Sequence, residues 1–299
     1  MEQLEASSAV THLCVSPGAA RKPAGDVVSC DIAREAATTV IESLRDLGLE
    51  RRGAIAVETV DITMSQAAEQ AEREAPGDPA DALVWEDLEQ RAGDETRLSV
   101  TYLAFMVVAT IIASVGVMLD QPILIVGAMV VGPEFGPLAA LCVGVVSRAP
   151  RQAAGAVGTL AVGFAVGITV TIVATWALDA VGLIEESMLT GERPLTSFIW
   201  QPDALSWIVG FLAGIAGMLS LTSQKSGALV GVLISVTTIP AAANAAAALA
   251  YWVPDEAVGS LIQLGLNLSA IVVGGVLTLG LQKMHQDRLV RREISQVAR

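Results

Sequence analysis

The sequence ILIVGAMVVGPEFGPLAALCVGVV, residues 123–146, is apolar and long enough to cross a lipid bilayer. Its middle carries Gly132, Pro133, Glu134, Gly136 and Pro137. Proline lacks a backbone N–H and collides with the preceding helical turn, so this segment is predicted to break into two half-helices. Inside hydrocarbon, the backbone groups freed by a break must be buried in protein or face a wet cavity. We therefore expect a membrane protein with an intramembrane site.

The composition agrees with a membrane protein. Hydrophobic residues make up 53% of the chain and charged residues 16%, which is too apolar for an ordinary soluble domain. Residues 1–98 hold 20 acidic and 9 basic residues, a net charge of −11, whereas residues 99–299 hold 11 and 9, a net charge of −2. An acidic front part argues against a nucleic-acid partner and against adsorption to anionic lipid.

The start of the chain and the cysteines carry no special signal. The first ten residues have neither the basic nor the apolar region of a signal peptide, so none is expected. Cys14, Cys30 and Cys142 do not have the spacing of metal ligands. We expect free thiols in a reducing compartment, with no metal and no cofactor.

Three parts of the chain are predicted: an acidic cytosolic α/β domain over residues 1–95, a transmembrane domain over 96–282 and a basic cytosolic tail over 283–299. In the first part, residues 9–15, 54–62 and 82–88 are predicted strands, and residues 31–47 and 65–75 are predicted helices. This βαβαβ order indicates a small ferredoxin-like domain. His12 is interpreted as a satisfied imidazole and not as a metal ligand, because no partner cluster lies nearby in sequence.

The membrane part is predicted to be a bundle of six spans in a mainly α protein. The predicted spans are residues 99–119, 123–146, 153–180, 204–221, 227–250 and 258–281. Glycines in the third span, at positions 155, 158, 163 and 167, are typical of close contact between helices.

The positions of lysine and arginine predict the orientation. With both termini in the cytoplasm, 17 of the 18 basic residues fall on the inner side and only Arg193 lies outside. We therefore expect a multi-pass protein of the plasma membrane. The outer turns are acidic, which either concentrates cations at the mouth of a path or only reflects loops that avoid positive charge.

Spans two and five are each interrupted by proline near their centres, at Pro133 and Pro240. Three spans in each half would give the halves opposite orientations, a 3+3 inverted repeat. Paired proline-interrupted spans at matching places indicate the midplane site of a transporter.

Glu134 is the central candidate for that site. A carboxylate at this depth is costly and is interpreted as binding a cation or exchanging a proton. The alternative is a local helix cap that is paired internally. Near Pro240, the hydroxyls of Ser235, Thr237 and Thr238 are placed to satisfy freed backbone or simply to bond within the helix. Asn244, Gln263 and Asn267 either line the site or join helices. The predicted ion or substrate site comprises Gly132, Pro133, Glu134, Gly136, Pro137, Thr237, Thr238, Pro240, Asn244 and Asn267.

Three segments resemble a known family. The run IIASVGVMLDQPILIVGAMVVGPEFGPLAALCVG resembles the hallmark of the domain of unknown function 389, a family of uncharacterised prokaryotic membrane proteins. SGALVGVLISVTTIPAAANAA and GSLIQLGLNLSAIVVGGVLTL are similar to its second proline segment and its last span. The resemblance covers residues 99–281 and implies a multi-span fold with a soluble domain, but no reaction. This chain departs from the pattern with Glu134 in an apolar position and with one proline, Pro240, where two often occur.

Two functional hypotheses follow. The first is a secondary transporter or channel for a small ion or solute, embedded in the bilayer and assembled as a homo-oligomer. The second is a membrane-anchored sensor or scaffold whose cytosolic domain binds a ligand or partner. An enzyme is not expected, because the six spans contain no histidine and the chain has no hydrolase, zinc-protease or phosphate-loop motif.

Overall fold

The computed structural model describes residues 1–58, 60, 63–75, 84–223, 231–232, 234 and 236–297. The chain divides into two compact units. The first contains Met1–Leu88 together with Lys283–Arg299, and the second is Glu89–Gln282. Helix α14 (Pro254–Val297) is continuous and contributes to both units.

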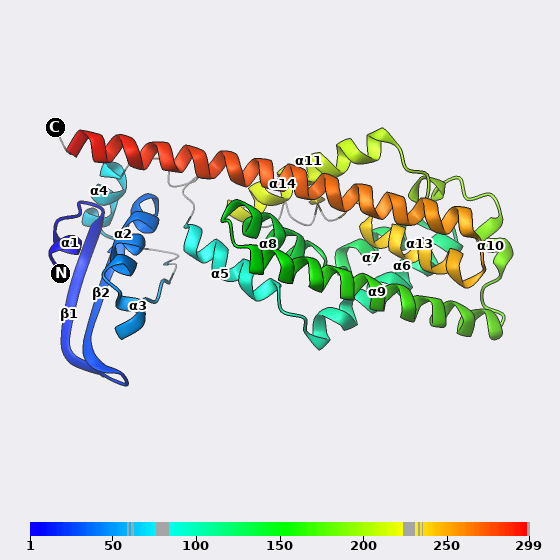
Figure 1. Ribbon diagram of the computed structural model, residues 1–299, viewed down its shortest axis with the longest axis horizontal. Helices are drawn as coiled ribbons and strands as arrows, with labels where there is room; N and C mark the ends of the chain where they lie inside the picture. Colours follow the sequence, from blue (N-terminus) through cyan, green and yellow to red (C-terminus); the bar gives the residue numbers. More distant parts are fainter. Residues whose placement is uncertain are drawn as a thin grey trace. The chain divides into compact units, whose positions relative to one another are not determined.

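The first unit is built on an antiparallel hairpin of β1 (Val10–Arg21) and β2 (Ala24–Ile32), which is visible in Figure 1. Around it are the short helices α1 (Glu2–Glu5), α2 (Arg34–Asp46), α3 (Leu49–Arg52) and α4 (Gln66–Glu74). The predicted helices over residues 31–47 and 65–75 are confirmed as α2 and α4, and the Ser65 hydroxyl caps α4 by accepting a hydrogen bond from the backbone N–H of Ala68.

The predicted ferredoxin-like order is wrong for the described residues. β1 runs beyond the predicted strand over residues 9–15 and continues through Pro17 to Arg21, with a register shift between Ser16 and Ala20 that accommodates Pro17 and Gly18 in the two-stranded sheet. Of the predicted strand 54–62, residues 54–58 and 60 form no strand, and the others lie outside the described residues.

The third predicted strand, residues 82–88, is also wrong where it is described. Helix α5 (Trp85–Glu95) begins at Trp85, which packs to 6% exposure. Nζ of Lys283 lies over the Trp85 ring, 4.9 Å from the ring centroid. The indole N–H donates a 2.6 Å hydrogen bond to Oε1 of Gln286. Trp85 of α5 therefore packs against α14 and does not pair in a sheet.

The second unit consists of apolar helices. They are α6 (Val100–Met118), α7 (Pro122–Val131), α8 (Phe135–Val146), α9 (Pro150–Ala180), α11 (Ala204–Thr222), α13 (Thr238–Ala250) and the first part of α14, with α10 (Glu186–Thr190) and the short 3-10 helix η1 (Ser197–Ile199) in the loop after α9. Four helices, α6, α9, α11 and α14, are long and apolar enough to span a bilayer. The fold is that of a membrane-embedded helical protein.

The second predicted span is broken as expected. Helices α7 and α8 meet at an angle of 53° across residues 132–134, and together they can form a fifth span. Pro122 starts α7 at its first position, where a missing N–H costs nothing. Asp120 has a positive φ of 50° in the tight turn before it.

The fifth predicted span, residues 227–250, is not confirmed as a crossing. Of residues 227–250, the helix α13 has only 13 residues, which is too short to cross a bilayer, and positions 227–230, 233 and 235 lie outside the described residues. All residues of α13 except Leu249 are buried, and its many alanines allow α6, α7 and α9 to pack closely around it. Figure 1 shows α13 among these helices.

Glycines bring the longer helices together. A β-carbon on Gly163 of α9 would stand 2.7 Å from the Tyr102 ring of α6, and one on Gly167 would stand 3.1 Å from Thr110. A β-carbon on Gly214 of α11 would overlap the backbone carbonyl of Ile271 in α14. The small residues of these helices therefore set the helix contacts, as the sequence predicted for α9.

Candidate functional site

Two half-helices begin beside each other in the second unit. Helix α8 begins at Phe135 and α13 at Thr238, and each carries a proline at its third position, Pro137 and Pro240. A proline there removes only an N–H that would have no partner within the helix. The hydroxyl of Thr238 donates a 2.6 Å hydrogen bond to Oε1 of Glu134, the residue that precedes α8. The two helix starts are therefore joined through the Glu134 carboxyl group.

Glu134 is almost completely enclosed, with 5% of its surface exposed. Among the described residues its second oxygen, Oε2, is buried and has no hydrogen-bond partner. That oxygen lies against Gly132, where any β-carbon would overlap it and would also stand 2.7 Å from Ile239. Because helix N-termini carry partial positive charge, the ends of α8 and α13 favour an anionic carboxylate here.

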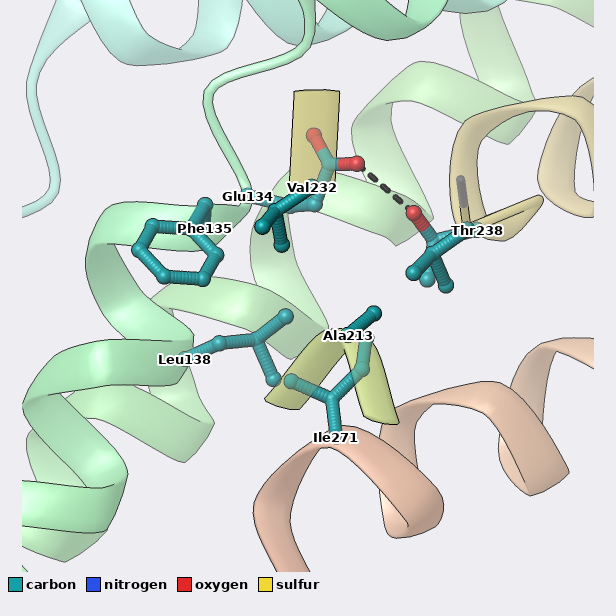
Figure 2. A pocket seen from close by; sticks show the side chains of 8 residues that line it. Glu134, Phe135, Leu138, Ala213, Val232, Thr238 and Ile271 are labelled. Carbon is teal, nitrogen blue, oxygen red and sulfur yellow. Dashed lines mark hydrogen bonds between the residues drawn. The ribbon is translucent and has the colours of Figure 1, made fainter. Parts of the chain in front are cut away.

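A small cavity lies beside Glu134 (Figure 2). Its volume is about 20 Å³, enough for one water molecule. Figure 2 shows the Glu134 carboxyl group and the Thr238 hydroxyl next to each other, with apolar side chains around the rest of the cavity. The lining residues are Glu134, Phe135, Leu138, Ala213, Val232, Val236, Thr238 and Ile271. A carboxyl group beside such a space can hold a proton or contact one water-sized polar group.

The remaining predicted residues of the break lie close to this carboxyl group. Pro133 lies in the break between α7 and α8, and Gly136 is in the first turn of α8. A β-carbon on Gly136 would overlap the carboxyl group of Glu95. A second acid, on an exposed residue, thus lies against the start of α8. Sequence reasoning did not single out Glu95, because nothing in its local pattern distinguishes it from the other acids of the front part.

Asn267 and Asn244 extend the polar region away from the cavity. The amide of Asn267 donates to the Thr237 hydroxyl at 3.0 Å and accepts from Gln263 at 3.5 Å. The amide of Asn244 donates to Glu256 at 2.9 Å and to Ser260 at 2.8 Å. The structure therefore connects Thr237 with Asn267, but it places Asn244 in a separate cluster.

That cluster contains a buried ion pair. Nη2 of Arg193 pairs with Oε1 of Glu256, and Nη1 donates to Asn244 at 3.1 Å. Arg193 is 7% exposed and Glu256 5% exposed, so both side chains are buried although both lie in segments that the sequence assigns to the outer side. The sequence contained a pattern that could have indicated a buried polar cluster. Four polar residues recur at intervals of four, three and four, which places them on one helical face: Glu256, Ser260, Gln263 and Asn267.

His12 in the first unit also has partners that local sequence did not show. Its Nδ1 lies 2.6 Å from Asp31 of β2, and its Nε2 lies 2.9 Å from the Ser65 hydroxyl that caps α4. Both ring nitrogens have partners, so the expectation of a satisfied imidazole is confirmed. The expectation that this imidazole is partly buried, with no partner cluster nearby, is wrong, because its side chain is 44% exposed and Asp31 and Ser65 lie beside it. In the part of the chain that the structure describes, no group of three or more His, Cys, Asp or Glu side chains could hold a metal ion.

The long apolar helices and the broken span define a class, the multi-span membrane proteins. Residues 129–273 match the family model for the domain of unknown function DUF389. The resemblance read from the motifs is therefore confirmed over these residues. The matched region contains both half-helix starts and ends on α14.

A relative in Methanocaldococcus jannaschii, named as the uncharacterized protein MJ0678, is 26% identical over 217 residues. The alignment covers 71% of this chain and 64% of that protein, so the chain spans less than two thirds of the relative's length. No solved structure matches this chain. Neither the family model nor this relative is named for an activity.

Proposed function

We propose that this protein is a secondary transporter or channel for a small ion or solute, with Glu134 as the carboxylate that responds to a cation or proton. The single observation that supports it is the environment of Glu134. The carboxyl group is buried between two half-helix starts and beside a cavity, with one oxygen bonded to Thr238 and the other without a partner among the described residues. The half-helices would be the interrupted segments of an inverted repeat.

The pairing of charged side chains supports a functional role for Glu134 and not a purely structural one. A buried carboxylate that only stabilises the fold is expected to pair with a basic side chain. The buried guanidinium of the second unit, Arg193, is instead bonded to Glu256 and Asn244. Glu134 therefore retains an oxygen that can accept a proton or contact a small cation.

The proposal also covers assembly and location. We place the protein in the plasma membrane with both termini in the cytoplasm, as the distribution of basic residues predicts. This placement requires an even number of crossings, and so a sixth crossing by residues 227–250, the segment that contains α13. We propose a homo-oligomer that packs through α9, since a β-carbon on Gly158 would meet nothing within 4 Å in the described chain and leaves that surface open to close approach. Native mass spectrometry in detergent would measure the subunit number.

The test is ion or solute flux into liposomes that contain the purified protein, with Glu134→Gln beside wild type. Gln keeps the shape of the side chain but cannot carry the charge, so the variant is expected to change the rate or remove its dependence on pH. Thr238→Val removes the hydroxyl bonded to Oε1 and is expected to alter the same property. Thr278→Val is the matched control, because its buried hydroxyl bonds to the carbonyl of Gly274 in its own helix.

A second candidate is a membrane-anchored sensor or scaffold. The observation that favours it is the continuity of α14, whose residues belong to both units. In the first unit, Trp85 contacts Lys283 and Gln286 of this helix. A helix whose residues belong to both units can carry a change from one unit to the other. If no flux appears over a broad panel of ions and solutes, and removal of residues 1–95 abolishes the cellular phenotype, the sensor is favoured.

We propose no enzymatic role. The chain of bonds Ser65–His12–Asp31 has the connectivity of a hydrolase triad, but Ser65 already caps α4, and the side chains of His12 and Asp31 are each 44% exposed to water. A fluorophosphonate probe should not label Ser65. A covalent adduct on Ser65 that disappears in His12→Ala would overturn this part of the proposal.

A further inference from the structure

A stripe of buried polar residues runs along α14. It comprises Glu256, Ser260, Gln263 and Asn267, which are 5%, 0%, 0% and 2% exposed. At about 1.5 Å per residue, these eleven steps cover about 16 Å. That is about half of a bilayer core of roughly 30 Å. Polar side chains in such a row are costly inside an apolar bundle unless they are bonded or meet water.

Hydrogen bonds connect the stripe to Glu134. Asn267, at its far end, donates to the hydroxyl of Thr237 at 3.0 Å. The next residue, Thr238, donates to Glu134 at 2.6 Å. Between the two ends, Oε1 of Gln263 is buried without a partner among the described residues. An unpartnered acceptor of this kind is a place where water or a small cation gains bonds.

The other end of the stripe is closed by a loop. Arg193, between α10 and η1, inserts its guanidinium against Glu256 and Asn244. The loop is held by Asp120, which accepts hydrogen bonds from the Thr196 hydroxyl at 2.8 Å and from the backbone N–H of Leu195 at 3.3 Å. A fixed positive charge at the end of a narrow polar path excludes cations.

We propose that the stripe of α14 is one half of the path to Glu134, and that Arg193 is the plug that closes it at the end where α14 begins. This rests on the proposed function, and it names the route and the gate of the same site. The path carries water and a proton or small monovalent cation when Arg193 leaves Glu256. Because burial removes the hydration of both charged groups, moving the guanidinium into water recovers part of that loss and makes opening accessible.

The test measures water access and not flux, so its outcome is independent of whether transport is detected. Ser260→Cys is introduced into protein that carries Cys14→Ser, Cys30→Ser and Cys142→Ala. A membrane-impermeant thiol reagent is then added to each side of the reconstituted protein in turn. Ile262→Cys, two residues away on the outward face and 50% exposed in the described chain, is the matched control. In the bilayer it should stay unreactive throughout.

With Arg193 present, Ser260→Cys should react slowly. Arg193→Gln should speed its labelling at least about tenfold, because loss of one partner of a buried ion pair favours the opened arrangement. Asp120→Ala should act in the same direction by loosening the loop, and it leaves no unpaired charge buried. If Arg193→Gln does not elute as a folded protein, the labelling rate in Asp120→Ala tests the proposal in its place. The proposal is overturned if neither variant speeds labelling, or if Ser260→Cys reacts no more than Ile262→Cys in every background.

Discussion

At the scale of single residues, the site depends on how little space surrounds the Glu134 carboxyl group. Gly132 and Gly136 lie on either side of it in sequence, and a β-carbon on either would overlap a carboxyl oxygen, that of Glu134 in one case and of Glu95 in the other. Neither glycine has a positive φ. Glycine is therefore needed at these two positions because it leaves room for a carboxyl group, and not because the backbone conformation requires it.

Gly132→Ala is expected to destabilise the protein by about 1–3 kcal/mol, because the methyl group displaces Glu134 Oε2 and presses on Ile239. Gly127→Ala in α7, the helix that ends just before Gly132, is the control, since a β-carbon there meets nothing within 4 Å. Removal of an interior helix glycine should leave stability equal or raise it by up to about 1 kcal/mol. Thermal unfolding in detergent measures both. Equal midpoints for the two variants would contradict the packing described here.

At the scale of elements, helices pack through glycine where backbones meet. Gly214 of α11 faces the carbonyl of Ile271, and Gly274 of α14 faces the carbonyl of Phe211. Both contacts are with backbone, which cannot move aside as a flexible side chain can. Ile271 also lines the cavity beside Glu134, so this helix pair sets one wall of the site.

Gly214→Ala should therefore separate α11 from α14 and cost about 1–3 kcal/mol. Gly265→Ala on α14 is the comparison, because its β-carbon would meet nothing within 4 Å. The readout is again the unfolding midpoint, together with the rate of flux. A variant at Gly214 that matches Gly265→Ala in both would show that the two helices do not touch there.

The hairpin and α4 of the first unit are tied by His12. Its ring bonds to Asp31 of β2 and to Ser65 of α4, and φ of His12 is 48°, in the left-handed region. Beside a register shift, this conformation turns the ring toward both partners.

His12→Ala is expected to cost about 1–2 kcal/mol, because it removes two hydrogen bonds that join three elements. Hydrogen exchange should become faster in α4 and at the start of β1. Ser29→Ala, at an exposed serine of β2, serves as the control and should leave exchange in α4 unchanged. Identical exchange in both variants would mean that the hydroxyl and imidazole are bonded to water instead.

At the scale of the whole molecule, the question is which helices cross the membrane. Four helices are long enough, the bent pair of α7 and α8 can form a fifth span, and α13 is short and buried at every residue except Leu249. The distribution of basic residues nevertheless predicts a strict alternation of sides, with the loop after α9 outside and the segment after α11 inside.

Cysteine labelling tests that alternation. Ser187→Cys in α10 should react with an impermeant thiol reagent applied to intact cells, whereas Ser226→Cys, at a position outside the described residues, should react only in inverted vesicles. The background lacks Cys14, Cys30 and Cys142. Reaction of both positions from one side would mean that α11 does not cross the membrane.

Local chemistry was enough to predict the break at Gly132–Glu134, the interruption near Pro240 and the long apolar spans. These features depend on missing N–H groups and on continuous apolar length, which are properties of neighbours in sequence. The acid at residue 134 could be recognised as unusual on the same basis.

Partners across the fold could not be predicted, because they are set by which helices meet. The pairing of Arg193 with Glu256, the bond from Thr238 to Glu134 and the extension of β1 through Pro17 each join or reshape segments through tertiary packing. A charge in a loop appears the same in sequence whether it faces water or enters a bundle. Only the packing of α13 against its neighbours decides that Arg193 is buried, and a buried guanidinium must find a carboxylate.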